Sequence, residues 1–147
     1  MDMFDLTSFK ERLSERAQKV IKVAIEEAQK RNHYYLAVEH IFHALSVVET
    51  KLFDTVFESI GIAPDLIRKT TNNYINASRQ YLGVGVKITP EVKSLFQNAY
   101  ENSRNSGRYL ITSVDLFIAA FQNSKWIPSK IVREFGVTPQ EVINGIV

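Results

Sequence analysis

The stretch Gly61-Ile62-Ala63-Pro64 returns later in the chain as Gly136-Val137-Thr138-Pro139, and this recurrence decides the fold. In both places an apolar helical pattern ends at the glycine, and the proline suits the start of a further helix. The same spacing places Phe42 on Phe117. Because apolar positions agree more often than identical residues do, the repeat indicates one fold unit used twice. Two copies are too few for an open solenoid, so we expect one compact pseudo-twofold domain.

Apolar residues at helical spacing predict four helices in each copy, and no alternating pattern of useful length predicts a strand. The helices are expected at about 14–31, 39–48, 52–60 and from Pro64 onward, then at about 90–104, 114–122, 127–135 and from Pro139 onward. We therefore predict an all-α fold of two tandem four-helix repeats. The expected organisation is repeat one at about 13–75, a connector at about 76–87 and repeat two at about 88–147, in one domain over 8–147.

Residues at the helix ends agree with these boundaries. Ser14 and Thr89 carry hydroxyls that can accept a hydrogen bond from an unpaired backbone N–H at a helix start. Asn32 and Gly107 stand at matching places just after the first helix of each copy. A helix often ends there in a positive φ, which asparagine and glycine adopt at least cost.

Composition narrows the classes of function. The 147 residues carry a net charge of +2, with basic and acidic residues interspersed, so the sequence favours no nucleic-acid partner. The absence of cysteine excludes disulfides, thiolate chemistry and cysteine-ligated metals. The start of the chain lacks the pattern of a signal peptide or a membrane anchor. We expect a cytoplasmic location, no membrane partner and a monomeric isolated domain.

Two blocks carry a family resemblance. The segment Ser14-Glu15-Arg16-Ala17-Gln18-Lys19-Val20 and the segment Val38-Glu39-His40-Ile41-Phe42 resemble the opening blocks of the Clp N-terminal domain. This double-repeat module stands at the front of Clp-type AAA+ unfoldases. The chain resembles both the ClpC and the ClpB branch, and its sequence does not decide between them. The resemblance implies a domain that binds protein substrates and adaptor proteins and recruits them to an AAA+ ring.

A second class of function stays open from the residues alone. The chain has no Gly-x-x-x-x-Gly-Lys-[Ser/Thr] phosphate loop, so we expect no ATPase activity and no enzyme in this chain. It is then either the front piece of a longer unfoldase or a stand-alone Clp-N-like helical scaffold or anti-adaptor. Sequence after residue 147 would separate the two: a phosphate loop supports the first, and a stop codon supports the second.

The resemblance also implies four binding residues. In some members of the ClpC group the equivalent surface recognises phosphorylated arginine. By their places in the family blocks, Ser14 and Glu39 in the first copy, and Thr89 and Lys93 in the second, would bind such a ligand. A phosphate suits a capped helix start, and a guanidinium suits a carboxylate. The alternative is that the hydroxyls are only helix caps and that Glu39 only suits a helix start.

The second copy departs from the family pattern at one binding position. Val114 stands where the family has a glutamate, and Asp115 is one residue further. One step along a helix turns a side chain by about 100°, so Asp115 is not expected to replace that glutamate. We therefore expect any surviving phosphoarginine site to rest on Ser14 and Glu39.

A third class, a metal-dependent hydrolase, has little support. Glu39, His40 and His43 follow the order Glu-His-x-x-His, whereas zinc proteases use His-Glu-x-x-His with the histidines four residues apart. We expect structural histidines, no metal and no cofactor.

The aromatic residues Phe4, Phe9, Tyr81 and Trp126 lie outside the clearest helical stripes. They could form an exposed apolar groove for unfolded segments, or pack in the core. Gly83-Val84-Gly85 lies in the predicted connector, where we expect a flexible joint.

Overall fold

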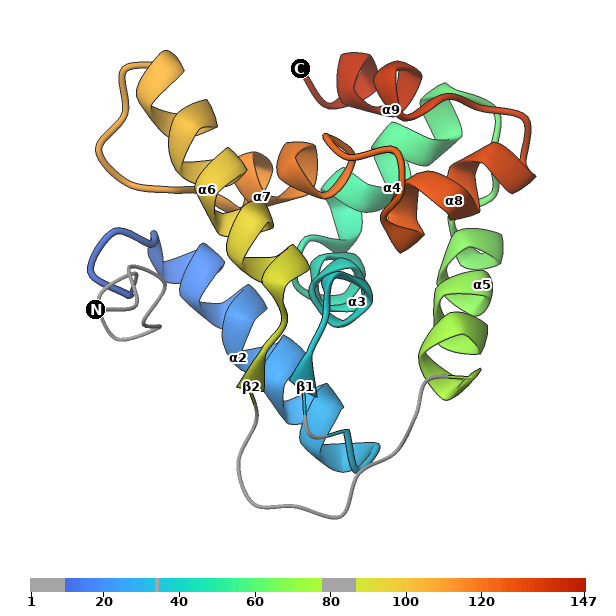
Figure 1. Cartoon of the computed structure of the whole chain (residues 1–147). Coiled ribbons are helices and arrows are strands. Elements are labelled where there is room, and N and C mark those ends of the chain that lie inside the picture. Colours follow the sequence, from blue (N-terminus) through green and yellow to red (C-terminus); the bar gives the residue numbers. More distant parts are fainter. Residues whose placement is uncertain (1–9, 34, 78–86) are drawn as a thin grey trace.

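The computed structural model describes residues 10–33, 35–77 and 87–147, in which eight helices surround a common core (Figure 1). Four helices precede the segment 78–86 and four follow it, so the predicted all-α fold of two four-helix repeats is confirmed. The elements are, in order, α2 (Glu15–Lys30), β1 (Tyr35–Leu36), α3 (Val38–Val48), α4 (Thr50–Ser59), α5 (Pro64–Ala77), β2 (Lys87–Ile88), α6 (Pro90–Asn105), α7 (Ser113–Ala120), α8 (Ile127–Glu134) and α9 (Pro139–Ile146).

The caps Ser14 and Thr89 and the helix ends at Asn32 and Gly107 are those that the sequence predicts. Ser14, Thr89 and Thr112 each accept a hydrogen bond from the backbone N–H three residues further on, at 3.2, 3.3 and 3.3 Å. The backbone then leaves the first helix of each copy through a positive φ, 59° at Asn32 and 73° at Gly107. Ser14 and Thr89 stand at equivalent positions, so the two copies share this local structure as well as the apolar pattern, whereas the position equivalent to Thr112 is held by Ala37, which has no hydroxyl.

Phenylalanine rings from both copies form the centre of the core. Helix α3, seen end-on near the centre of Figure 1, carries the fully buried Phe42. Its ring centroid lies 5.5 Å from that of Phe53 and 6.4 Å from that of Phe57, both in α4. From the other copy, Phe117 and Phe121 lie 6.4 and 5.5 Å away. One hydrophobic cluster therefore joins the repeats.

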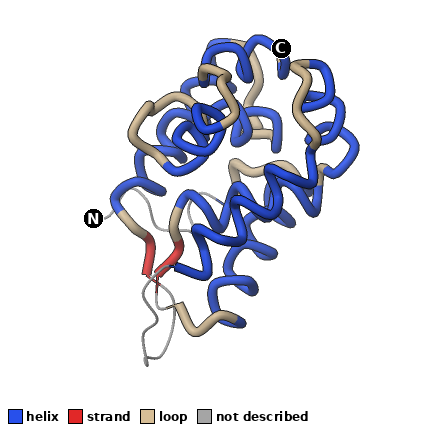
Figure 2. The backbone as a smooth tube through the Cα atoms, turned by 90° about the vertical axis from the view of Figure 1, so that its right-hand side faces the viewer, coloured by secondary structure: helices blue, strands red, loops and turns tan. Residues whose placement is uncertain are grey.

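Two very short strands, which the sequence did not predict, link the copies. Strand β1 pairs in parallel with β2, placing Leu36 opposite Ile88 (Figure 2). A single parallel bridge joins Leu13 to Ile111, which are the corresponding residues with the copies exchanged. In each case the residues before the first helix of one copy pair with the residues before the second helix of the other. The pairing between the copies is therefore crosswise.

The segment between α5 and β2 is shorter than the connector predicted at 76–87. Helix α5 continues to Ala77, and Lys87 already belongs to β2. The predicted joint at Gly83-Val84-Gly85 lies outside the described residues.

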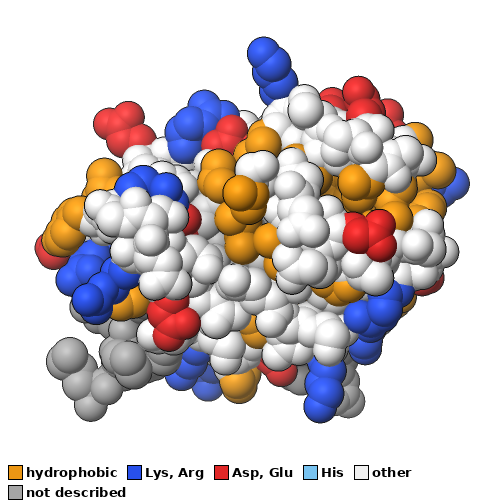
Figure 3. Space-filling model, turned by 90° about the horizontal axis from the view of Figure 1, so that it is seen from above, with side chains coloured by type: hydrophobic (Ala, Val, Ile, Leu, Met, Phe, Trp, Pro, Cys, Tyr) orange, Lys and Arg blue, Asp and Glu red, His pale blue; other side chains and the backbone are white. Residues whose placement is uncertain are grey.

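None of the described helices is both long and apolar enough to cross a membrane. On the face that Figure 3 shows, basic and acidic side chains are interspersed, and hydrophobic side chains lie between them.

Candidate ligand-binding site between the two repeats

A hollow of about 280 Å³ opens where α3 and α6 begin, and two of the four predicted site residues, Glu39 and Thr89, line it. Its wall comes from both repeats, because β1, α3, the start of α6 and the start of α8 all contribute. The lining residues are Tyr35, Ala37, Val38, Glu39, Thr89, Glu91, Lys125, Trp126 and Ile127.

The crosswise strand pairing decides which site residues meet. The backbone N–H of Thr89 donates to the carbonyl oxygen of Leu36 at 3.1 Å, which holds the start of α6 beside the start of α3. Ser14 lies elsewhere, since its N–H donates to the carbonyl oxygen of Ile111 at 2.9 Å, just before α7. Ser14 is not among the residues that line the hollow, so the hollow brings Glu39 together with Thr89 and not with Ser14. Each candidate site takes one helix start from each repeat.

Glu39 gives the hollow its electrostatic character. Burial raises the pKa of this half-buried carboxyl, and the charge of Glu91 raises it further, whereas Lys130 acts in the opposite direction. Among the described residues, Glu39 forms no ion pair. A poorly solvated carboxylate beside a second carboxylate attracts a cation, and a guanidinium can give it two hydrogen bonds at once.

The opposite side of the hollow suits an anionic group. Thr89, the cap of α6, and Glu91 in its first turn line this side. Pro90 has no N–H, and the N–H groups of Val92 and Lys93 donate to the hydroxyl and the carbonyl oxygen of Thr89, so the N–H of Glu91 and the Thr89 hydroxyl are the groups left to donate to an anion. The exposed Lys125 lines the same hollow and adds a positive charge. Glu91, also in the first turn of α6, opposes a phosphoryl group there. The hollow thus offers places for both ends of a phosphorylated arginine, with one carboxylate working against the phosphoryl end.

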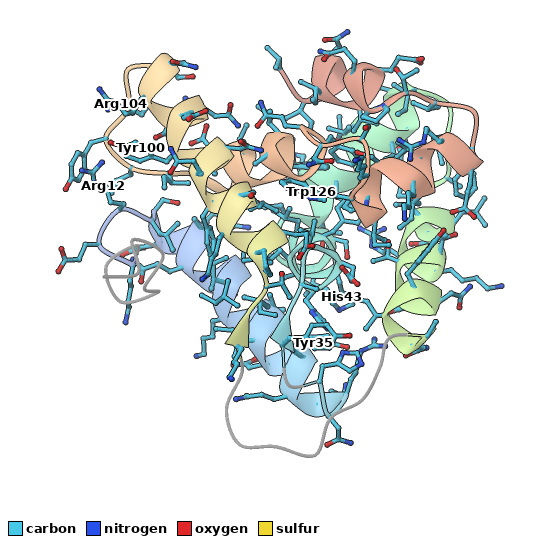
Figure 4. All side chains as sticks on the ribbon, in the orientation of Figure 1. Arg12, Tyr35, His43, Tyr100, Arg104 and Trp126 are labelled. Carbon is cyan, nitrogen blue, oxygen red and sulfur yellow. The ribbon has the colours of Figure 1, made fainter. Side chains whose placement is uncertain are left out.

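Trp126 supplies an aromatic wall. Its side chain is only 7% exposed, and it stands at the start of α8 (Figure 4). The other three residues predicted for an aromatic groove, Phe4, Phe9 and Tyr81, lie outside the described residues. Trp126 therefore combines core packing with a place in the hollow.

The fourth predicted residue, Lys93, lies in the first turn of α6 but is not among the residues that line the hollow. Sequence reasoning missed Tyr35, Glu91 and Lys125. None of these three belongs to a motif, and they reach the hollow only through the packing of one repeat on the other.

The internal repeat places an equivalent position at the starts of α2 and α7. The side chain of Arg16 occupies this equivalent position. Arg16 donates from Nε and Nη2 to the two carboxylate oxygens of Glu49, each at 2.9 Å. Its Nη2 also donates to the carbonyl oxygen of Val48 at 2.6 Å, and the hydroxyl of Ser113 donates to Glu49. The hydrogen bond from Arg16 is the main cause that holds the pKa of Glu49 below its usual range.

The histidines have structural partners. The N–H of Ala37 donates to Nδ1 of His40 at 2.9 Å, so neutral His40 carries its hydrogen on Nε2 and donates it to Nδ1 of His33 at 2.8 Å. Burial is the main cause that lowers the pKa of His40 to about 4. His43 lies 3.8 Å from a carboxylate oxygen of Glu27. The described residues contain no group of three or more side chains placed to hold a metal ion.

The second copy replaces this histidine pair with an ion pair. At the positions of His40 and His33 stand Asp115 and Arg108, which form a salt bridge. The N–H of Thr112 donates to Asp115 at 2.9 Å, as the corresponding N–H donates to His40 in the first copy. The backbone N–H at the helix start is therefore accepted by a member of an uncharged pair in one repeat and of a charged pair in the other.

Two further surface features lie away from the Glu39 hollow. A larger hollow of about 700 Å³ follows the exposed side of α2, and none of the four predicted site residues lines it. Arg12 stacks on Tyr100 with 5.1 Å between the guanidinium carbon and the ring centroid, and Arg104 stacks on the same ring at 5.6 Å (Figure 4). This second cluster joins the segment before α2 to α6.

The fold and the Glu39 hollow define a class of protein, an all-α domain of two repeats with a candidate ligand site between them. Residues 12–142 match the family described as the Clp repeat (R) N-terminal domain, and the chain belongs to this family.

Relatives and solved structures agree with the family. The chain is 25% identical over 144 residues to the chloroplastic chaperone protein ClpC2 of Oryza sativa subsp. japonica, covering 98% of this chain and 16% of that protein. The Hsp104 N-terminal domain of Candida albicans has a TM-score of 0.82 at 12% identity, covering 91% of this chain and 88% of that one. A ClpV N-domain in complex with a VipB peptide has a TM-score of 0.74 at 18% identity, covering 97% and 93%.

Proposed function

We propose that this domain binds protein substrates and adaptor proteins for an ATP-dependent Clp unfoldase, and that the Glu39 hollow is where it holds them. The observation that carries the proposal is the meeting of Glu39 and Thr89 in one hollow walled by both repeats. The chain spans about a sixth of the length of the curated relatives it matches, so the AAA+ ring belongs to this proposal as well. The structurally similar ClpV N-domain, which was solved in complex with a VipB peptide, supports protein binding.

The ligand we propose is an arginine side chain of the client, in its phosphorylated form. Its guanidinium would lie on the carboxylate of Glu39, and its phosphoryl group would lie at the start of α6, near Thr89 and Lys125. Trp126 would cover the aliphatic part of the side chain.

Recruitment by proximity is the proposed mechanism. A domain tethered to a ring raises the concentration of its client near the pore to roughly millimolar, so even a weak site is useful. Weak binding also lets the client leave when the ring pulls on it. We propose that this occurs in the cytoplasm and that the isolated domain is a monomer.

Glu39→Gln is expected to weaken binding of a phosphoarginine peptide by about ten- to a hundredfold, because a hydrogen bond between charged groups contributes about 1.5–3 kcal/mol. The measurement is an NMR titration of backbone amides, with the unmodified twin peptide beside it. The expected wild-type shifts lie at Glu39, Thr89 and Lys125.

The matched control is Glu58→Gln, which removes the same charge from an exposed position of α4. It should leave the affinity unchanged. Equal affinity of wild type and Glu39→Gln for the phosphorylated peptide would remove Glu39 from the site.

Glu91→Gln is expected to strengthen binding of the phosphorylated peptide by roughly two- to fivefold, because it removes a carboxylate that faces the phosphoryl group at an exposed position. The gain should shrink as salt is added, since screening weakens the repulsion in the wild type. Glu101→Gln serves as the control, because it removes the same negative charge from the same helix about three turns away. A gain of equal size in both variants would mean that Glu91 acts only through net charge.

A further inference from the structure

The two candidate positions related by the internal repeat differ in one respect: the chain's own Arg16 occupies one of them. We propose that Arg16 is an internal ligand that keeps this position closed to clients, so that each chain binds one client arginine, at the Glu39 hollow. The single-site statement rests on the proposed function of that hollow. The closed position can be tested by itself.

The contacts of Arg16 are those that a client arginine would make. Its planar guanidinium meets both carboxylate oxygens of Glu49 in a fork at 2.9 Å and reaches the carbonyl of Val48 as a third acceptor. Arginine is suited to this recognition because its N–H groups match a carboxylate in two parallel hydrogen bonds. The hydrogen bonds that a guanidinium ligand needs are therefore already present, and Arg16 uses them.

Exposure shows which groups lie outside and which lie beneath. The side chain of Arg16 is 60% exposed, whereas that of Glu49 is 15% exposed and Ser113 is 5% exposed. The guanidinium of Arg16 thus covers the carboxylate of Glu49, which also accepts a hydrogen bond from Ser113. Removal of the Arg16 side chain would leave the carboxylate of Glu49 with only the Ser113 hydroxyl and solvent as partners. A carboxylate in that position attracts another cation.

The Glu39 hollow has other residues at the positions that correspond to Arg16, Glu49 and Ser113. Glu91 stands at the position of Arg16, Ser124 at that of Glu49 and Val38 at that of Ser113. The cation is replaced by an anion, and the described residues place no guanidinium on Glu39. The residue differences between the copies therefore account for one closed and one open position.

An internal ligand has an advantage over a client. Arg16 is part of the chain, so its effective concentration at Glu49 is set by the fold and not by the client concentration. A free arginine side chain at micromolar concentration cannot displace it at comparable contact quality.

The test removes Arg16 and supplies its head group. Arg16→Ala should bind ethylguanidinium at millimolar concentration, with NMR shifts at the backbone amides of Glu49, Ser113 and Val114, and the wild type should show no shift there. Arg133→Ala, which removes an exposed arginine of α8, is the control and should behave as the wild type. The double variant Arg16→Ala, Glu49→Gln should lose ethylguanidinium binding. Because Arg16 is largely exposed, the single variant is expected to fold, and Arg16→Lys provides a milder second variant with a cation but no fork.

Stoichiometry completes the test. In calorimetry with the phosphoarginine peptide, the wild type should bind one peptide and Arg16→Ala two. Two peptide sites in the wild type would overturn the proposal. So would the finding that neither Arg16→Ala nor Arg16→Lys binds ethylguanidinium. A wild type that binds no peptide at the Glu39 hollow, with ethylguanidinium still bound at Glu49 in Arg16→Ala, would instead overturn the proposed function and support Arg16 as an internal ligand.

Discussion

Replacing Phe42 with alanine is expected to lower the free energy of unfolding by about 3–5 kcal/mol, the usual cost of removing a large aromatic side chain from a packed core. Phe42 is fully buried, and its ring meets rings from both copies, so no exposed neighbour can move in to fill the space. In urea the midpoint should fall while the slope of the transition stays that of the wild type. The unfolding should remain one transition, because the lost contacts join the repeats.

Phe135 offers a matched control. It is only partly buried and packs against the edge of the same hydrophobic cluster. Its replacement by alanine should cost clearly less than that of Phe42. A Phe42→Ala protein within about 1 kcal/mol of the wild type would mean that the core collapses around the gap at low cost.

Acidification is expected to cost the domain about 3 kcal/mol of stability through His40 between pH 6.5 and 4. Burial and the nearby charges of His33 and Arg31 lower the pKa of His40 to about 4 in the fold, from an ordinary value near 6.5. The unfolded chain therefore binds a proton at His40 before the folded chain does. The stabilisation is complete above pH 6.5 and is lost as the pH falls towards 4.

Other titratable groups of the domain modify this effect. The pKa values of His33 and Glu49 are also lowered, so both add to the loss of stability in acid. The raised pKa of Glu39 acts in the opposite direction, since its protonation favours the fold as the pH falls. Measured stability should therefore fall with acid, with the steepest part set by His40.

His40→Gln separates the role of His40 from the others. Glutamine at this third helical position can accept the N–H of Ala37 and has no proton to gain. Urea unfolding at several pH values should show a flatter dependence between pH 6.5 and 4 than in the wild type. The same slope in both proteins would show that other groups cause the acid sensitivity.

Local features of the fold were predictable from the sequence. Ser14 and Thr89 are caps, and Asn32 and Gly107 have positive φ, because such residues act through their immediate neighbours. The crosswise pairing was not predictable. Strands of two residues carry no alternating pattern, and a repeat in sequence says nothing about how its copies face each other.

This explains which part of the candidate site was missed. Glu39 and Thr89 could each be named from a block of sequence. The sequence did not predict that they lie in one hollow, because this depends on the hydrogen bond from the N–H of Thr89 to the carbonyl oxygen of Leu36. The clamp of Arg16 on Glu49 was missed for the same reason, since it joins a helix start to the end of another helix. A sequence pattern gives the members of such a site only where a family block contains them.

The exchange of strand partners has a consequence for how the domain can evolve. The residues just before α2, α3, α6 and α7 take their strand partners from the other copy, because Leu36 pairs with Ile88 and Leu13 with Ile111. Each copy is thus a template for the other, so a change in one copy's backbone path must be matched in its twin. Side chains are free of this constraint. The duplicated architecture can therefore stay fixed while its two faces diverge, one remaining receptive and the other occupied by the chain itself.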